Sequence, residues 1–356
     1  MLRLARSVTS LGQRHRVVAG VSGWLIGGGL IAWALAGRWD ELWAAAGRLS
    51  IGLALAAIAL QIVALVSRAE AWRSCVHGAG GTVERRRIYR ASGLGCAANL
   101  LSSHAGTAAR IALLRRSAPS ETPSMGALVA AEVPILVVEG VLAGIFSFTL
   151  VGPLGLPWWT PIVCALVTVA VAGGLAAAGR PAGRGICRGL AVLRASRARE
   201  RLVGFVLVAV VAQIARNWLM LHAVGVDASV FDAIAVLIAV VMLGQLPIGP
   251  TAGAGAAVLI LGPQGLVAAA AAGMLLTATG TIGSLAFGTW AALDRLHVSH
   301  VASALRRQHA ATVALHHAIA GLPSARRRVV EVAYFGGLSH TQISRTLGLP
   351  AVGLAV

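Results

Sequence analysis

Two carboxylates, Glu132 and Glu139, stand inside the long apolar run of residues 125–151. They are seven positions apart, so on a helix they share one face, about 10 Å apart along the axis. An ionisable group at membrane depth costs a few kcal/mol and normally faces the interior of a helix bundle or water. The spacing therefore predicts a polar face that is turned inward.

A second polar face lies in the apolar run 203–224, which contains Arg216 and Asn217. A carboxylate beside Arg216 would offset part of the desolvation free energy of both groups, so we expect Arg216 to pair with Glu139 or Glu132. Two interpretations remain open. Either these groups line a path for polar lipid headgroups, or they form a structural ion pair with Glu132 near the membrane surface.

The weakly apolar segment 91–114 contains a third polar group, formed by Asn99, His104 and Arg110. Since the arginine fork donates two hydrogen bonds to a phosphate, this group is a candidate site for a headgroup phosphate. The alternative is that His104 and nearby serines bond the backbone of a hairpin while Arg110 extends to the membrane surface. The segment is too polar for a lipid-facing span, and we expect a re-entrant helical hairpin.

The sequence shows no catalytic or metal-binding pattern. It has no nucleophile motif with a base at a defined spacing, no HExxH motif, and no CxxC pair among its four cysteines. We therefore expect no enzyme activity, no cofactor and no metal ion.

The composition indicates what kind of molecule holds these groups. Of the 356 residues 57% are hydrophobic and only 12% are charged, and the mean hydropathy is +0.81. Soluble domains carry about 25% charged residues. These values exclude a disordered chain and a disulfide-stapled secreted domain, and they argue against a soluble enzyme. We predict an all-α, polytopic transmembrane helical bundle.

Apolar runs of about 20 residues are long enough to cross a bilayer, and we expect roughly six to eight spans. The runs lie at residues 17–37, 51–67, 125–151, 158–179, 203–224, 228–246 and 266–293, the last of them as one helix or two half-helices. Arginines gather between the runs, above all at 68–90 and 180–201, as is typical of cytoplasmic loops. We therefore expect a multi-pass protein of the plasma (inner) membrane with a cytoplasmic N-terminus.

The segment 247–265 is rich in glycine and proline and predicts a second broken hairpin, interrupted at Pro247, Pro250, Gly253 and Gly255. The two glycines permit close approach of the backbone to a ligand, or tight packing of helices through small residues. The sequence leaves both interpretations open.

The chain divides into four segments by composition. Hydropathy falls and arginine and histidine become frequent from His297 onward, so the clearest boundary lies near this residue. We expect a basic cytoplasmic N-terminus at 1–16, a transmembrane domain at 17–295, a basic helical linker at 296–321 and a short soluble helical fragment at 322–356.

The membrane part carries a family resemblance in two regions. One reads RAEAWR at 68–73 and NLLSSHAGTAAR at 99–110, and the other reads LPIGPTAGAG at 246–255. Together they resemble the lysylphosphatidylglycerol synthase transmembrane region, a flippase-like family. The resemblance implies a bundle with re-entrant helices that handles or translocates polar lipids, with membrane phospholipids as partners. Where that family has acidic residues, this sequence has Thr107 and, at 256–258, AAV.

The segment 322–350 has the pattern of two short helices. Gly336 and Gly337 separate them, and Ser339-x-x-Gln342 is a capping box that begins the second. This stretch closely resembles region four of bacterial RNA polymerase sigma factors, a helix-turn-helix that reads promoters.

The resemblance to sigma factors implies DNA or RNA polymerase as partners. The side chains expected to make such contacts are Arg326, Arg327, Arg328 and Arg345. The residues after Pro350 are AVGLAV, without the basic and polar side chains with which a recognition helix reads base edges. We therefore do not expect sequence-specific reading of DNA.

Three functions remain open. The first, which we favour, is a lipid-handling membrane protein of the flippase-like class. The second is a membrane-tethered, sigma-factor-like regulator that acts through the C-terminal helix-turn-helix. The third is a non-functional fusion of a membrane remnant with a sigma-factor fragment.

Overall fold

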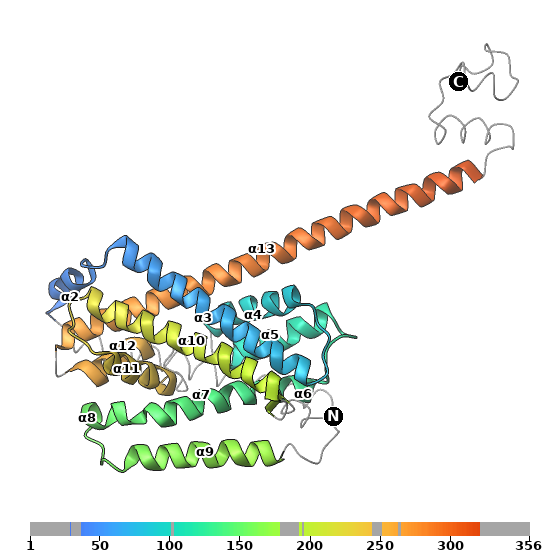
Figure 1. Ribbon diagram of the computed structural model, residues 1–356. Coiled ribbons are helices and arrows are strands. Elements are labelled where there is room, and N and C mark those ends of the chain that lie inside the picture. Colours follow the sequence, from blue (N-terminus) through green and yellow to red (C-terminus); the bar gives the residue numbers. More distant parts are fainter. Residues whose placement is uncertain are drawn as a thin grey trace, which may run out of the picture. The chain divides into compact units, whose positions relative to one another are not determined.

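The computed structural model describes residues 29, 37–100, 103–178, 192–193, 196–243, 251–262 and 265–320, without the side chains of 46, 103, 104, 175–178, 251 and 298–320 (Figure 1). The described residues form helices and connecting turns and contain no strand. The prediction of an all-α fold is therefore confirmed for this part of the chain.

Thirteen helical elements follow one another in the described residues. They are α2 (Trp39–Ala46), α3 (Ile51–Gly78), α4 (Arg85–Asn99), α5 (Ser103–Ser117), α6 (Met125–Ala130), α7 (Val133–Ile145), the 3₁₀ helix η1 (Phe146–Leu150), α8 (Val151–Leu154), α9 (Thr160–Ala178), α10 (Ser196–Ala223), α11 (Val230–Leu243), α12 (Thr251–Leu261) and α13 (Leu266–Ala320).

The chain forms two compact units, Met1–Ala292 and Leu293–Val356. Helix α13 contributes to both of them. The buried core and all the side-chain contacts described below belong to the first unit.

Four of the described helical stretches are long and apolar enough to cross a membrane. They are Ile51–Gly78, Met125–Leu154, Ser196–Ala223 and Leu266–His297. Helix α11, with 14 residues, is about 21 Å long, which is shorter than the ~30 Å hydrocarbon layer. The expected six to eight spans are therefore not confirmed, and the run predicted at 17–37 lies almost wholly outside the described residues.

The structure settles two of the expectations about the backbone. Residues 91–99 belong to helix α4 and residues 103–114 to helix α5, and the two helices pack against each other. The run 266–293 is part of the continuous helix α13, so the alternative of two half-helices is wrong. Of the second predicted hairpin, residues 251–261 form helix α12, and Pro247 and Pro250 lie outside the described residues.

Helix α3 is the central element of the first unit. It begins at Ser50, whose side chain accepts a hydrogen bond from the Leu53 backbone N–H at 3.3 Å, an N-cap that satisfies one free amide. It packs along its length against α10 (Figure 1). Buried alanines such as Ala64 of α3 and Ala209 of α10 allow the two backbones to come close.

Glycines bring α13 equally close to its neighbours. A Cβ atom at Gly93 of α4 would lie 2.8 Å from the Phe287 carbonyl oxygen, and one at Gly283 would lie 2.7 Å from Cγ of Gln61. A residue with a side chain would push these helices apart. The close approach matters because it brings α13 against the polar side chains described next.

Candidate functional site

Two of the predicted polar side chains form an ion pair inside the bundle. Nη2 of Arg110, on α5, donates a hydrogen bond to Oε2 of Glu132, which lies immediately before α7. Each side chain is only 17% exposed. The Arg110 guanidinium also stacks on Trp72 of α3, 4.3 Å from the ring centroid, and Trp72 is fully buried. A cation and an aromatic ring in such a dry environment attract each other by about 2 kcal/mol.

A second ion pair lies one helical turn away along α3. Nη2 of Arg68 is 2.6 Å from Oε1 of Glu139, and the two side chains are 35% and 19% exposed. Oε1 of Glu139 and Nε of Arg68 make no hydrogen bond of good geometry within the described structure, so this contact is an electrostatic one. Since Arg68 and Trp72 are four residues apart on α3, the two ion pairs are neighbours.

The predicted pairing of Arg216 with Glu139 or Glu132 is wrong. Arg216, on α10, donates from Nη1 to Oε1 of Gln61 on α3. Both carboxylates have other partners, because α3 presents Arg68 to Glu139 and the α4–α5 hairpin presents Arg110 to Glu132. Periodicity within single helices correctly turned these groups inward, but it carries no information about which helices are neighbours.

The surroundings of Arg216 are polar and small. Asn217 is 1% exposed; its amide nitrogen lies 3.5 Å from the Ala233 carbonyl oxygen, and its Oδ1 has no partner among the described groups. On α13, Gly280 is adjacent to Arg216, since a Cβ there would lie 3.1 Å from Nη1. Sequence reasoning named Arg216 and Asn217, but it missed Gln61 and Gly280.

Of the predicted group of Asn99, His104 and Arg110, the structure describes the side chains of Asn99 and Arg110, and these two have different neighbours. Asn99 is exposed and lies against Gly106, where a Cβ would overlap its side chain. Arg110 points to Glu132 and Trp72 instead. The side chain of His104 lies outside the described residues. Arg110 is mostly buried and paired with Glu132, an arrangement that favours the inward-facing interpretation over one in which Arg110 extends to the membrane surface.

The glycines of the second predicted hairpin have packing roles. A Cβ at Gly253 would lie 3.0 Å from the Gly273 carbonyl oxygen of α13, and one at Gly255 would make ordinary contact with Leu243, at 3.6 Å. Gly253 therefore allows α12 to pack closely on α13, which is the second of the two interpretations left open.

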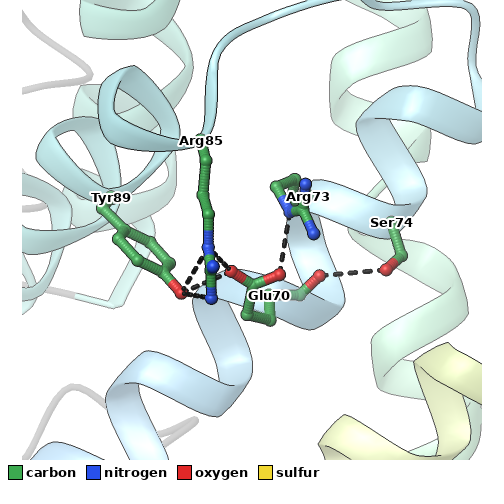
Figure 2. Close-up of polar contacts among 5 residues, drawn as sticks. All are labelled: Glu70, Arg73, Ser74, Arg85 and Tyr89. Atoms are coloured by element: carbon green, nitrogen blue, oxygen red, sulfur yellow. Dashed lines mark hydrogen bonds and ion pairs between the residues drawn. The ribbon is translucent and has the colours of Figure 1, made fainter.

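A further polar cluster, which sequence reasoning missed, lies around Glu70 near the end of α3 (Figure 2). Glu70 is 2% exposed. Its carboxylate accepts hydrogen bonds from Nε of Arg73 at 2.8 Å, from Nε of Arg85 at 2.5 Å and from the Tyr89 hydroxyl. Burial and donation to Glu70 raise the pKa of Tyr89 above its usual range. The cluster joins α3 to the start of α4.

Arginines surround this end of the first unit. The Thr82 backbone N–H donates to the Glu121 carbonyl oxygen at 3.0 Å, and Gly78 packs against Val192. The end of α3, the start of α4, the segment after α5 and the segment before α10 therefore lie together. Exposed arginines at the start of α4 and in the adjoining ends of α5 and α10 are Arg85, Arg86, Arg115, Arg116, Arg197, Arg199 and Arg201. We call these residues the arginine-rich end.

Comparison with known proteins identifies one part of the chain. Residues 312–352 match the family described as sigma-70, region 4, which supports the resemblance of the C-terminal segment to a sigma-factor helix-turn-helix. The match begins in the last turns of α13, and from residue 321 onward it lies outside the described residues. No curated protein and no solved structure matches the chain, and none of the comparisons supports the resemblance of the membrane part to lysylphosphatidylglycerol synthase.

Proposed function

We propose that this chain is an integral membrane protein of the flippase-like class that binds the headgroups of polar phospholipids between its helices and translocates them. The observation that carries the proposal is the Arg110–Glu132 pair on Trp72, within a unit whose helices are apolar enough to cross a membrane. Ionised groups in such a setting are costly and mark the paths of polar substrates. The proposal involves no catalytic step and no cofactor.

The chemistry of the pair suits a lipid headgroup. The guanidinium fork binds two phosphate oxygens as readily as it binds a carboxylate. A headgroup phosphate can therefore replace Glu132 as the partner of Arg110. The released carboxylate can then accept a hydrogen bond from a hydroxyl or ammonium group of the same headgroup. Arg68, one turn from Trp72 along α3, and Glu139 of α7 form a second arginine–carboxylate pair. In our proposal this pair binds the headgroup at the next position along the path.

The arginine-rich end supports an orientation. Loops rich in arginine remain on the cytoplasmic side of a membrane, so this end of the first unit faces the cytoplasm in our proposal. The protein then lies in the inner membrane with the starts of α4 and α10 on the cytoplasmic side.

A lipid-translocation assay in reconstituted vesicles tests the proposal. We expect the wild-type chain to move a labelled phospholipid between leaflets faster than empty vesicles do, and Arg110→Ala to reduce the rate about tenfold or more, since a charge-assisted hydrogen bond is worth roughly 1.5–3 kcal/mol. Arg38→Ala is the matched control, because Arg38 pairs with Glu41 at an exposed position, where the side chains are 46% and 58% exposed. A wild-type rate equal to that of empty vesicles would refute the proposal.

The sigma-70 match favours a second candidate, a membrane-tethered regulator that contacts DNA or RNA polymerase through residues 312–352. A gel-shift assay with the full chain in detergent, at physiological salt, tests it. A preference for promoter DNA over scrambled DNA supports this function. Binding that is salt-sensitive but indifferent to sequence rejects it, because such binding reflects phosphate contacts alone. Failure of both assays would favour the non-functional fusion.

A further inference from the structure

Arg216 carries a buried positive charge that has no acidic partner among the residues that the structure describes. Its side chain is 9% exposed, and an arginine does not lose its proton in proteins. Its Nη1 donates to Gln61, which is a neutral acceptor, and its Nε has no partner among the described groups.

The acidic side chains of the described residues offer no counter-charge to Arg216. The sequence has 12 of them, and all except Glu331 lie in the described residues. None of the described ones is seen in an ion pair with Arg216, and the three that are mostly buried have other partners: Glu132 pairs with Arg110, Glu139 with Arg68, and Glu70 with Arg73 and Arg85. Removing one partner of a buried ion pair is strongly destabilising, because an uncompensated charge remains. Among the described residues, Arg216 is such a buried charge without a partner of opposite charge.

Among the described groups, Nε of Arg216 has no hydrogen-bond partner. Gln61 occupies Nη1, whereas the edge formed by Nε and Nη2 is the one that binds two oxygens of an oxyanion side by side. The neighbouring Asn217 has a buried Oδ1 without a partner among the described groups, and this oxygen can accept a hydrogen bond from a hydroxyl group. Gly280 contributes no side chain beside the guanidinium.

We propose that Arg216, oriented by Gln61 and flanked by Asn217, binds one phosphate group between α3, α10 and α13. The ligand is the phosphate of a lipid headgroup or a free phosphate ion. The inference rests on the proposed function only for the lipid source, because the missing counter-charge calls for an anion in either case.

The test uses Gln61→Glu in the full-length protein, purified in a neutral, phosphate-free detergent. This change replaces the neutral acceptor with a carboxylate of the same shape, so it builds the missing counter-charge into the protein. Gln61→Met is the matched comparison, since it removes the acceptor without adding a charge. The melting temperature is measured in chloride, in inorganic phosphate at the same ionic strength, and in micelles containing phosphatidylglycerol or a neutral glycolipid.

We expect phosphate, phosphatidylglycerol or both to raise the melting temperature of the wild-type protein, and the glycolipid to have no effect. Gln61→Glu should melt higher than wild type in chloride and should bind the effective anion at least about tenfold more weakly, which corresponds to about 1.4 kcal/mol. Gln61→Met should melt lower than wild type in chloride. A response to phosphatidylglycerol alone identifies a lipid headgroup, and a response to inorganic phosphate identifies a site that accepts the free ion.

Two results would overturn the inference. One is a wild-type protein whose melting temperature responds to neither phosphate nor phosphatidylglycerol. The other is a Gln61→Glu variant that is less stable than wild type in chloride and responds to the anion just as wild type does. Lipid translocation is measured in a separate assay. A wild-type protein that binds the anion but does not translocate lipid would refute the proposed function without contradicting the phosphate site.

Discussion

Glu70 shows how a single buried carboxylate joins two helices. It accepts hydrogen bonds from Arg73 on its own helix and from Arg85 and Tyr89 on α4 (Figure 2). Several donors on one carboxylate keep it ionised and hold the surrounding side chains in place. The cluster therefore ties α4 to α3 through side chains as well as through the connecting turn.

Glu70→Gln is therefore expected to destabilise the first unit. The change removes the charge from a group whose donors are partly exposed, so we expect a loss of about 1–2 kcal/mol, seen as a lower melting temperature in detergent. Glu84→Gln is the control, because Glu84 is 63% exposed and lies 3.7 Å from Arg87. Equal effects of the two changes would contradict the role assigned to Glu70.

The Arg110–Glu132 pair is expected to show energetic coupling. In a cycle of Arg110→Gln, Glu132→Gln and the double variant, the double variant should lose less stability than the sum of the single changes, by about 1–3 kcal/mol. Arg38→Gln with Glu41→Gln provides the comparison, since solvent screens that exposed pair and its coupling should be much weaker than that of Arg110 with Glu132. Additive losses for Arg110 and Glu132 would show that the two groups do not interact.

At the scale of elements, glycine decides how closely the helices approach. Gly106 of α5 faces Gly95 of α4, and a Cβ at Gly106 would lie 2.6 Å from the Gly95 carbonyl oxygen. Because that oxygen belongs to the backbone, the hairpin cannot relieve the overlap by rotating a side chain. The two glycines therefore allow α4 and α5 to pack together.

Gly106→Ala is expected to destabilise the hairpin by about 1–3 kcal/mol, the usual range for overpacking. Gly204→Ala, in the middle of α10, has open space around its Cβ and should stabilise the protein by about 0.5–1 kcal/mol through helix propensity. Thermal melts in detergent give both values. A tolerated alanine at 106 would mean that α4 and α5 are not packed as described.

The sequence was sufficient to predict helices and which side chains face inward, but it was not sufficient to predict their partners. The apolar run 125–151 corresponds to α6 through η1, and the run 203–224 to most of α10. Composition and periodicity are properties of a single segment, so the helices predicted from them agree with those in the structure. Glu132 and its partner are 22 residues apart, and Arg216 and Gln61 are 155 residues apart. Such pairings depend on how the helices are packed together, which no local pattern records.

At the scale of the whole molecule, the structure describes a unit of apolar helices, and the family comparison describes the C-terminal segment. The first unit has apolar helices with ionised groups between them, and residues 312–352 match sigma-70 region 4. A protein with these parts can handle lipids, regulate transcription at a membrane, or do neither. The first two alternatives require that the first unit is inserted in a bilayer.

Flotation of the full-length protein with lipid vesicles through a density gradient, in alkaline urea, tests that requirement most directly. Alkaline urea strips proteins that are bound only to the membrane surface, and aggregates sink rather than float. We predict that the chain floats with the vesicles and leaves them only when detergent is added. Recovery of the chain as a folded, detergent-free protein in the dense aqueous fraction would contradict the account.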